Sequence, residues 1–348
     1  MIKLGKIKII EPGPLTTVQD LGRPGFQRYG MPQAGAMDSF ACRTASRLVG
    51  NEDNSAVLEF TMKGPTIEFL QPTALAVTGP NFKPHLNGCL IPQWRSIYAG
   101  SKTVLSFPSN PSGAGGRGYI AFKGGIDVPR IMGSRSTYIK GGIGGFKGRP
   151  LEEEDVLIVK EKAQKSDFSD AYLPAANRPD YDTEITARVI MGPQDKNFSS
   201  SGIENFLGGN FTVTAQADRM GYRLQGPSIE HRRKDSADII SDGIPPGAVQ
   251  VPGHQNPIIM MADRQTTGGY PKIATVITSD QDRIAQLKPG NIINFKRIKV
   301  DRADELLQKR EKRLEKIQRS NLKLISDNFY RIKVEGHDFN ARVEEIEA

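Results

Sequence analysis

Short runs of apolar and β-branched residues follow one another along most of the chain, and glycine, proline, asparagine and aspartate separate them. Runs of this kind between turn residues are typical of the strands of β-sandwiches and β-barrels. They lie at 74–78, 103–107, 119–122, 156–159, 185–191, 211–215, 258–262, 273–278 and 292–295. The pattern therefore predicts a mainly β protein.

Three segments predict helices instead. Asp38 is a good N-cap for a helix that ends at Gly50, because apolar positions after it share one face. A second helix is expected after residues 279–280 and ends before Pro289. A third, long helix is expected over 302–325, where Leu307, Leu314 and Asn321 recur every seven residues. Because polar residues such as Asn321 occupy some positions of this repeat, we expect the helix to pack against the body of the protein and not to form a coiled coil.

The polar stretch 161–183 contains two prolines and is interpreted as a linker between two β-rich units. This predicts an N-terminal β-rich subdomain over 1–165, a second over 184–298, and a C-terminal extension over 301–348. The last part of the extension, 328–347, alternates around Gly336 and predicts a small hairpin.

The net charge is +8, and the 11 basic and 11 acidic residues from 301 onward cancel, so the body carries the whole surplus. Such a surplus attracts acidic small molecules such as nucleotides or carboxylates. No basic block with interleaved aromatics is present, so no nucleic-acid partner is expected. No apolar run approaches the ~18 residues of a membrane span, and the charged N-terminus is no signal peptide, so we expect a cytoplasmic protein without a membrane partner.

Cysteine and histidine usage excludes several site classes. Cys42 and Cys89 are the only cysteines and form no CxxC, so we expect two buried thiols. The four histidines have no metal-ligand spacing, and no metal site is expected. The Gly-x-Ser-x-Gly elbow, the Walker A loop and the Rossmann fingerprint are all absent.

The segment 263–272 is the strongest candidate for chemistry. A strand leads to Asp263 and a Gly-Gly turn, and Lys272 begins the next strand. Freed backbone N–H groups and a lysine can hold a carboxylate, a phosphate or a developing oxyanion. We therefore predict a hairpin that faces a cleft near residues 19–23 or 218–219, with Lys272 binding an anion. Asp263 would act as a base, position a water or hold a metal-bound nucleotide. A polar hairpin without function is the alternative.

Other polar segments are candidates for the same site, and each of them also has a purely structural interpretation. Asp20 and Arg23 could instead form a structural ion pair, and Asp38 could be a plain N-cap. Glycines at 141–149 could bind an anion or simply form turns at the rim of a barrel. The predicted catalytic residues are Asp263, Lys272 and Asp20. The predicted substrate-binding residues are Gln19, Arg23, Asp38, Asp218, Arg219, Gln250, Gln265, Thr266, Thr267, Gly268, Gly269 and Tyr270.

Taken in order, the segments 14–23, 35–38, 124–126 with 136–138, and 263–272 resemble a known family. It is the allophanate hydrolase subunit 2-like family, also called biotin-dependent carboxyltransferase-like, and the resemblance runs from residue 3 to about 320. It implies two β-rich subdomains, of which the C-terminal one is a cyclophilin-like barrel. The helix and hairpin of the C-terminal extension have no match in it.

The resemblance implies several functions, because the family includes the C-type subunit of the ATP-dependent 5-oxoprolinase. That enzyme converts 5-oxoproline to L-glutamate, which implies ATP with Mg²⁺ as co-substrate and a small carboxylate substrate. The implied partners are a kinase-inhibitor-like protein, which is the B-type subunit, and a lactam-utilisation protein, which is the A-type subunit. The alternatives are a non-catalytic antagonist of a kinase-inhibitor-like protein and the carboxyltransferase component of a urea-carboxylase-like enzyme.

Covalent biotin is not expected, because a biotinyl carrier needs an Ala/Val-Met-Lys-Met turn that Met62-Lys63-Gly64 does not supply. After co-expression with biotin ligase, intact-mass spectrometry should give the unmodified mass of this chain. A biotin carrier domain treated in parallel should gain the biotinyl mass. The same gain on this chain would refute the expectation.

Overall fold

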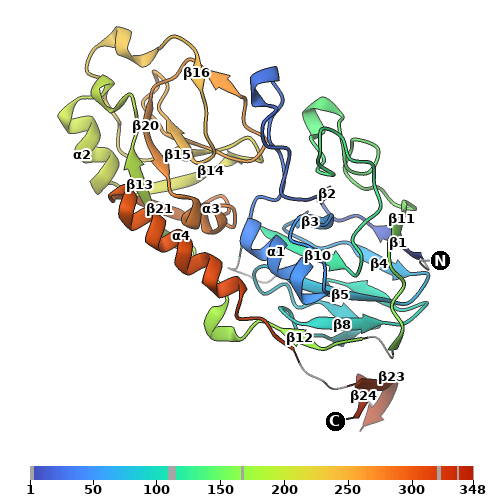
Figure 1. Cartoon of the computed structure of the whole chain (residues 1–348). Helices are drawn as coiled ribbons and strands as arrows, with labels where there is room; N and C mark the ends of the chain where they lie inside the picture. Colours follow the sequence, from blue (N-terminus) through green and yellow to red (C-terminus); the bar gives the residue numbers. More distant parts are fainter. Residues whose placement is uncertain (1–3, 109–114, 166–167, 320–322, 335–336, 348) are drawn as a thin grey trace.

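A computed structural model describes residues 4–108, 115–165, 168–319, 323–334 and 337–347. The chain forms two β-rich lobes side by side, and a C-terminal helix runs along one side of both (Figure 1). The fold is mainly β, as the sequence predicts. None of the helices in the described segments is long and apolar enough to cross a membrane.

The N-terminal lobe consists of two sheets that enclose an apolar core. The first sheet has the strand order β11 (Val156–Val159), β1 (Gly5–Glu11), β4 (Thr66–Phe69), β9 (Val104–Ser106), β6 (His85–Leu86) and β7 (Cys89–Leu90). The second has the order β2 (Leu15–Gln19), β3 (Val57–Thr61), β10 (Arg117–Phe122), β5 (Thr73–Thr78) and β8 (Ser96–Ala99). Phe60, Phe69 and Phe122 lie in the core between them.

Both faces of the second sheet are buried, because α1 (Ser39–Leu48) covers the face that turns away from this core. Along β10, Ile120 and Phe122 enter the core between the sheets, whereas Tyr119 and Ala121 contact the cluster under α1. Asp38 accepts a hydrogen bond from the Ala41 N–H at 2.9 Å, so its expected role as the N-cap is confirmed. Cys42 and Cys89 are buried free thiols.

The C-terminal lobe is a closed barrel of seven strands. Their order is β13 (Glu184–Met191), β20 (Lys272–Val276), β17 (Ala248–Gln250), β18 (Ile258–Met260), β15 (Gly221–Gln225), β14 (Phe211–Ala217) and β21 (Ile292–Arg297). Parallel pairing of β21 with β13 closes the barrel. The sequence pattern missed α2 (Ser200–Gly208), which Phe206 fixes to the barrel by stacking on Phe295 with ring centroids 4.4 Å apart.

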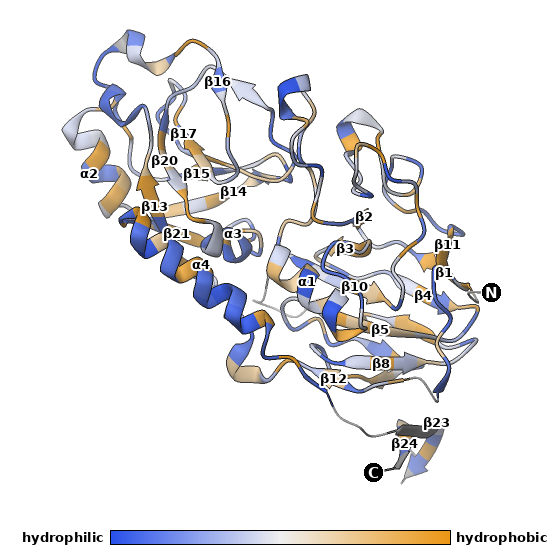
Figure 2. Cartoon of the chain, viewed as in Figure 1, coloured by the Kyte–Doolittle hydropathy of each residue, from blue (hydrophilic) through white to orange (hydrophobic). Residues whose placement is uncertain are grey.

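The long helix predicted over 302–325 is wrong at its C-terminal end. α4 (Val300–Leu314) ends once Leu314 is buried beside α1. The chain then forms β22 (Gln318–Arg319), whose backbone pairs with β12 (Ala171–Tyr172) in the segment expected to be a linker. This pairing replaces helical hydrogen bonds, while Asn321 lies outside the described residues. Figure 2 shows hydrophilic residues along most of α4, in keeping with its surface position.

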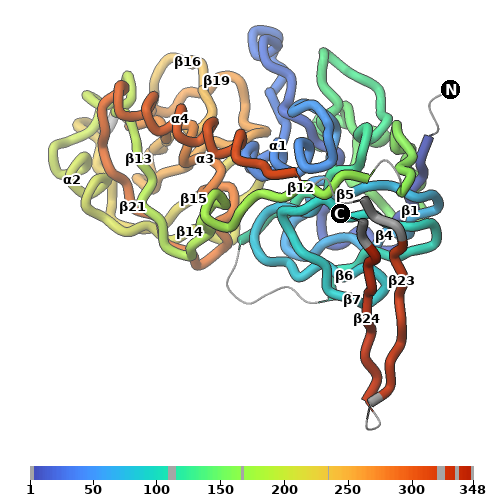
Figure 3. The backbone as a smooth tube through the Cα atoms, turned by 60° about the horizontal axis from the view of Figure 1, so that its bottom comes forward, coloured from blue at the N-terminus to red at the C-terminus, as the bar shows by residue number. Residues whose placement is uncertain are grey.

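The predicted C-terminal hairpin is confirmed by the pairing of β23 (Lys323–Val334) with β24 (His337–Glu347), although Gly336 lies outside the described residues. The hairpin extends away from the N-terminal lobe (Figure 3). Several large apolar side chains on it are exposed, those of Tyr330, Ile332, Phe339 and Val343.

The hairpin predicted at 263–272 is wrong. β18 pairs with β15 and β17, and β20 pairs with β17 and β13, so β17 lies between the two strands that were expected to pair. The connecting segment leaves the barrel and forms β19 (Thr267–Gly268), which pairs with β16 (Asp242–Gly243). The segment is therefore a connection between non-adjacent strands.

Candidate functional site

A network of buried polar side chains joins the two lobes, and Arg219 lies at its centre. Its guanidinium binds both oxygens of Asp263, with Nε to Oδ2 and Nη2 to Oδ1 distances of 2.9 Å each. Nη1 donates to Glu59 on β3, and Nη2 also donates to the Gly35 carbonyl at 2.7 Å. Burial alone would lower the pKa of Arg219, but the charges of Asp263 and Glu59 raise it well above its ordinary value. One barrel side chain thus holds two segments of the N-terminal lobe.

Glu59 extends this network into the second sheet. Its Oε2 accepts from the Met37 N–H at 2.8 Å and from the Tyr119 hydroxyl at 2.7 Å. Next to it, Arg117 on β10 donates across the lobe boundary to the Tyr222 hydroxyl and the Ala285 carbonyl. The outer face of β3 and β10 is therefore a polar docking face for the barrel.

Asp38 forms a second node of the network. Besides capping α1, it accepts from the Tyr181 hydroxyl and from Gln286 Nε2, both at 2.8 Å. Burial and the nearby charge of Asp282 raise the pKa of Asp38 to about 7. Asp282 is itself bound by Arg310 of α4, with Nε 2.6 Å from Oδ2.

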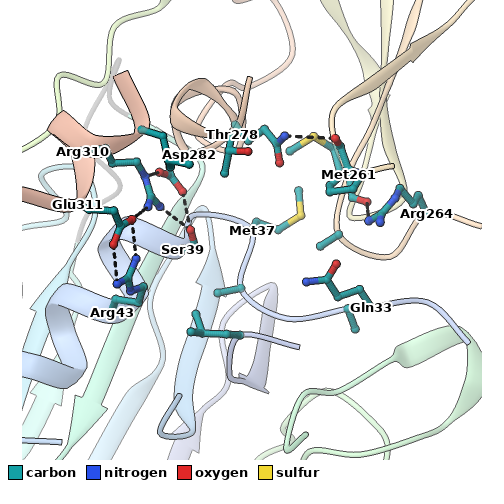
Figure 4. A pocket seen from close by; sticks show the side chains of 17 residues that line it. Gln33, Met37, Ser39, Arg43, Met261, Arg264, Thr278, Asp282, Arg310 and Glu311 are labelled. Atoms are coloured by element: carbon teal, nitrogen blue, oxygen red, sulfur yellow. Dashed lines mark hydrogen bonds and ion pairs between the residues drawn. The ribbon is translucent and has the colours of Figure 1, made fainter. Parts of the chain in front are cut away.

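A cavity of about 350 Å³ lies between the lobes in front of this network (Figure 4). At one end lies an acid–base cluster formed by Arg43, Asp282, Arg310 and Glu311. Arg264 lies at the other end, and Met37 and Gln33 lie between them. Residues from both lobes and from α4 contribute to the walls, so the cavity exists only when all three are in place.

The predicted residues near the N-terminus form a group of their own. The Asp20 carboxylate accepts from Ser134 Oγ at 2.6 Å, the Arg135 N–H at 2.6 Å, the Gly22 N–H at 2.8 Å and Ser136 Oγ. Through three of these hydrogen bonds, Asp20 holds the segment 134–136 against the end of β2.

Arg23 does not form an ion pair with Asp20, which was the structural alternative to a role in the site. It is fully buried and donates only to the Ser136 carbonyl, while its Nε and Nη1 have no partner among the described residues. Burial lowers the pKa of Arg23. Gln19 binds Thr17 Oγ1 and the Thr137 carbonyl, so it belongs to the same group.

The other predicted residues divide between two further places. Lys272 pairs with Asp242 at 2.7 Å, and it does not contact Asp263, both of whose oxygens bind Arg219. Gln250 donates to the Tyr270 carbonyl at 3.3 Å, and the side chains of Gln250 and Gln265 flank Gly268. These residues, with Thr266, Thr267 and Gly269, lie around the β16–β19 ribbon.

Asp218 is exposed and binds the backbone N–H groups of Met220 and Gly221 in a turn. In the glycine-rich segment, a Cβ on Gly144 would lie 2.1 Å from the Ser136 carbonyl oxygen, and φ there is +72°. This close approach supports the turn interpretation of that segment.

None of the predicted site residues lines the cavity, although Arg219, Asp263 and Asp38 lie in the network behind it. The sequence did carry a signal for this network, because Glu59 and Arg117 are charges inside apolar strands, and such charges are rarely buried without partners. Asp282 and Arg310 had no local signal, since only the tertiary fold brings them to the cavity. Arg264 lies inside the 263–272 segment that the sequence marked as the strongest candidate, but it was not itself predicted.

Comparison with known proteins assigns the family. Residues 29–297 match the family described as carboxyltransferase domain, subdomain A and B. The chain therefore belongs to this carboxyltransferase-domain family, in agreement with the resemblance found in its motifs.

Two bacterial relatives match over nearly their whole length, and both are C-type subunits of 5-oxoprolinase. The chain is 37% identical over 315 residues to the one from Escherichia coli, which covers 89% of this chain and 97% of the relative. It is 34% identical over 316 residues to the one from Haemophilus influenzae, covering 90% and 98%.

A solved structure shares the fold. The crystal structure of the Kluyveromyces lactis urea amidolyase superposes with a TM-score of 0.82 at 30% identity. The superposition covers 89% of this chain and 20% of that much longer one.

Removing the central guanidinium should destabilise the protein strongly. Arg219→Met removes the bidentate partner of Asp263 and leaves Glu59 with only the more distant guanidinium of Arg117, 3.9 Å away. Breaking a buried pair in this way costs about 3–5 kcal/mol. The matched control is Arg223→Met on the same strand β15, whose side chain is exposed and should change the free energy of unfolding by less than ~0.5 kcal/mol. Equal denaturation midpoints for the two variants would contradict the central role of Arg219.

The raised pKa of Asp38 should give the folded state a distinct pH dependence. Between its ordinary value of 3.8 and about 7, folded Asp38 keeps a proton that the unfolded chain loses. The stability contribution therefore falls as pH rises through this window, with a slope of at most ~1.4 kcal/mol per pH unit. Asp38→Asn keeps a capping oxygen and should flatten this slope in urea titrations from pH 4 to 7. Parallel curves for both proteins would show that Asp38 is not the titrating group.

Proposed function

We propose that this chain is the C-type subunit of an ATP-dependent 5-oxoprolinase, which opens the lactam of 5-oxoproline to L-glutamate. The observation that carries the proposal is the correspondence with the Escherichia coli C-type subunit over 97% of its length at 37% identity. The lobe-spanning cavity supports it, because its volume of about 350 Å³ suits a small cyclic substrate.

The chemistry explains why ATP is part of the proposal. The amide of a five-membered lactam is stable, so the proposed route transfers the γ-phosphoryl group of ATP to the lactam oxygen and releases ADP. Water then adds to the activated carbon and the C–N bond breaks as the nitrogen takes a proton. Hydrolysis of the acyl phosphate that this leaves releases phosphate and L-glutamate. The surplus of +8 on the chain favours both the nucleotide and the carboxylate of the substrate. Among the described residues, no group of three or more His, Cys, Asp or Glu side chains could hold a metal ion. Mg²⁺ that accompanies ATP needs only one or two carboxylates besides the phosphates, so it stays part of the proposal.

The proposed partners are the kinase-inhibitor-like B-type subunit and the lactam-utilisation A-type subunit. The two bacterial relatives are named as subunits of 5-oxoprolinase, which supports assembly with other subunits. Asp263, Lys272 and Asp20, which the sequence predicts to be catalytic, do not line this cavity and are already bound by Arg219, Asp242 and the 134–136 segment. Their catalytic role therefore stays a prediction that the cavity does not support.

A second candidate function is the carboxyltransferase component of a urea-carboxylase-like enzyme. The TM-score of 0.82 with the Kluyveromyces lactis urea amidolyase favours it. Because the superposition covers only 20% of that chain, the match identifies a shared domain, and we rank this function second.

Co-expression with the A-type and B-type subunits tests the proposal. The complex should release ADP only when 5-oxoproline is present, whereas the isolated chain should show little or no such activity, because the proposed partners complete the site. The A-type and B-type subunits without this chain provide the control. A complex that leaves 5-oxoproline untouched but carboxylates urea in the presence of carboxybiotin would support the second function.

A further inference from the structure

Arg264 is a buried cation that has no acidic partner among the described residues. Only 2% of its surface is exposed. Its Nε donates to the Ile244 carbonyl at 2.9 Å and its Nη1 to the Met261 carbonyl at 3.2 Å. The neighbouring Asp263 cannot neutralise it directly, because both of its oxygens bind Arg219. Burial lowers the pKa of Arg264 to about 10, which reflects this missing counter-charge.

The two carbonyls fix the orientation of the guanidinium and leave one nitrogen free. No described residue accepts a hydrogen bond from Nη2, and Arg264 lines the inter-lobe cavity. Figure 4 shows Arg264 at one end of this cavity, held to Met261, with the acid–base cluster at the opposite end. A donor in a fixed position is therefore available at the cavity wall.

A buried cation costs several kcal/mol unless an anion or good hydrogen bonds compensate it. Two neutral carbonyls compensate it only in part. A ligand with an anionic group in the cavity would supply the counter-charge that Arg264 lacks. Arginine is well suited to this task, because its planar donors match a carboxylate.

The rest of the cavity limits the kind of anion. At the far end, Arg310 binds Asp282 at 2.6 Å and Arg43 binds Glu311 at 2.8 Å, so these two arginines already have counter-charges. Between the ends, the wall is largely apolar and includes Leu21, Ala34, Ala36, Met37 and Met261. The cavity therefore has one uncompensated cation, an apolar middle and a polar end without net charge. It suits a compact monocarboxylate better than a polyphosphate, because a polyphosphate needs several cations.

We propose that Arg264 binds the carboxylate of a small cyclic acid whose ring occupies the inter-lobe cavity. The identity of the acid as 5-oxoproline rests on the proposed function, whereas carboxylate binding at Arg264 does not. Arg264 thus determines specificity for acids over neutral lactams, and the acid–base cluster faces the other end of the ring.

The test compares an acid with its neutral analogue. In the assembled complex, Arg264→Gln should raise KM for 5-oxoproline at least tenfold with a much smaller change in kcat. Isothermal titration should show that wild type prefers 5-oxoproline over 5-oxoprolinamide and that the variant has lost this preference. Arg264→Lys restores the charge and should recover part of the preference. Arg297→Gln, an exposed change on β21, is the matched control and should behave as wild type.

Two results would overturn the proposal. One is unchanged acid binding by Arg264→Gln, and the other is an equal loss of acid and amide, which indicates a purely structural role. If the Gln variant does not fold, the acid-to-amide ratio of the Lys variant decides, because a structural role leaves that ratio unchanged.

Failure of the proposed function is distinguishable from failure of this inference. If the wild-type complex neither binds nor hydrolyses 5-oxoproline, the function fails, and acetate becomes the probe on the isolated chain. At fixed ionic strength, acetate should then raise the melting temperature of wild type relative to chloride but not that of Arg264→Gln. An equal response of both proteins, or none in wild type, overturns the carboxylate site.

Discussion

The contact on which the rest of the structure depends is the buried guanidinium of Arg219 between Glu59 and Asp263. Each of these charges would be costly in the interior alone, so the barrel and the second sheet of the N-terminal lobe require each other. Such a group contributes more to geometry than to net stability, because apolar residues could stabilise the same interface. The Arg219 group fixes the relative position of the two lobes, and this position determines the shape of the cavity between them.

The polar interface continues through Asp38 to α4. Gln286 and Tyr181 reach Asp38 from the barrel side and from the inter-lobe connection, and Arg310 reaches Asp282 and Ser39 from the helix. The cavity wall is therefore supported by residues from four distant parts of the chain. Ser39, Asp282 and Arg310 belong both to this framework and to the cavity wall, so a change in the interface also changes the cavity.

Local patterns predicted the strands well, because a buried strand such as β5 is visible as a short apolar run between turns, and a cap such as Asp38 acts within its own helix. α2 was missed because its first turn, with Ser200, Ser201 and Gly202, has weak helix propensity and Phe206 supplies the tertiary contact. The 263–272 segment was misread because strands adjacent in sequence need not pair in a barrel. Many of the predicted site residues do lie in clusters, but only the tertiary fold brings Arg310 to the cavity, and Arg264 was not predicted although it lies inside the 263–272 segment.

The order of these partners along the chain matters for synthesis on the ribosome. Glu59 can bind Arg219 only after another 160 residues have been synthesised. Ser39 can bind Arg310 only after another 271 residues. A nascent N-terminal lobe can pair its strands early, yet its polar docking face has to stay hydrated until the barrel and α4 have emerged. The two lobes therefore cannot mature one after the other as independent modules, because the docking face of the first lobe stays unpaired until its partners in the barrel and α4 have been synthesised.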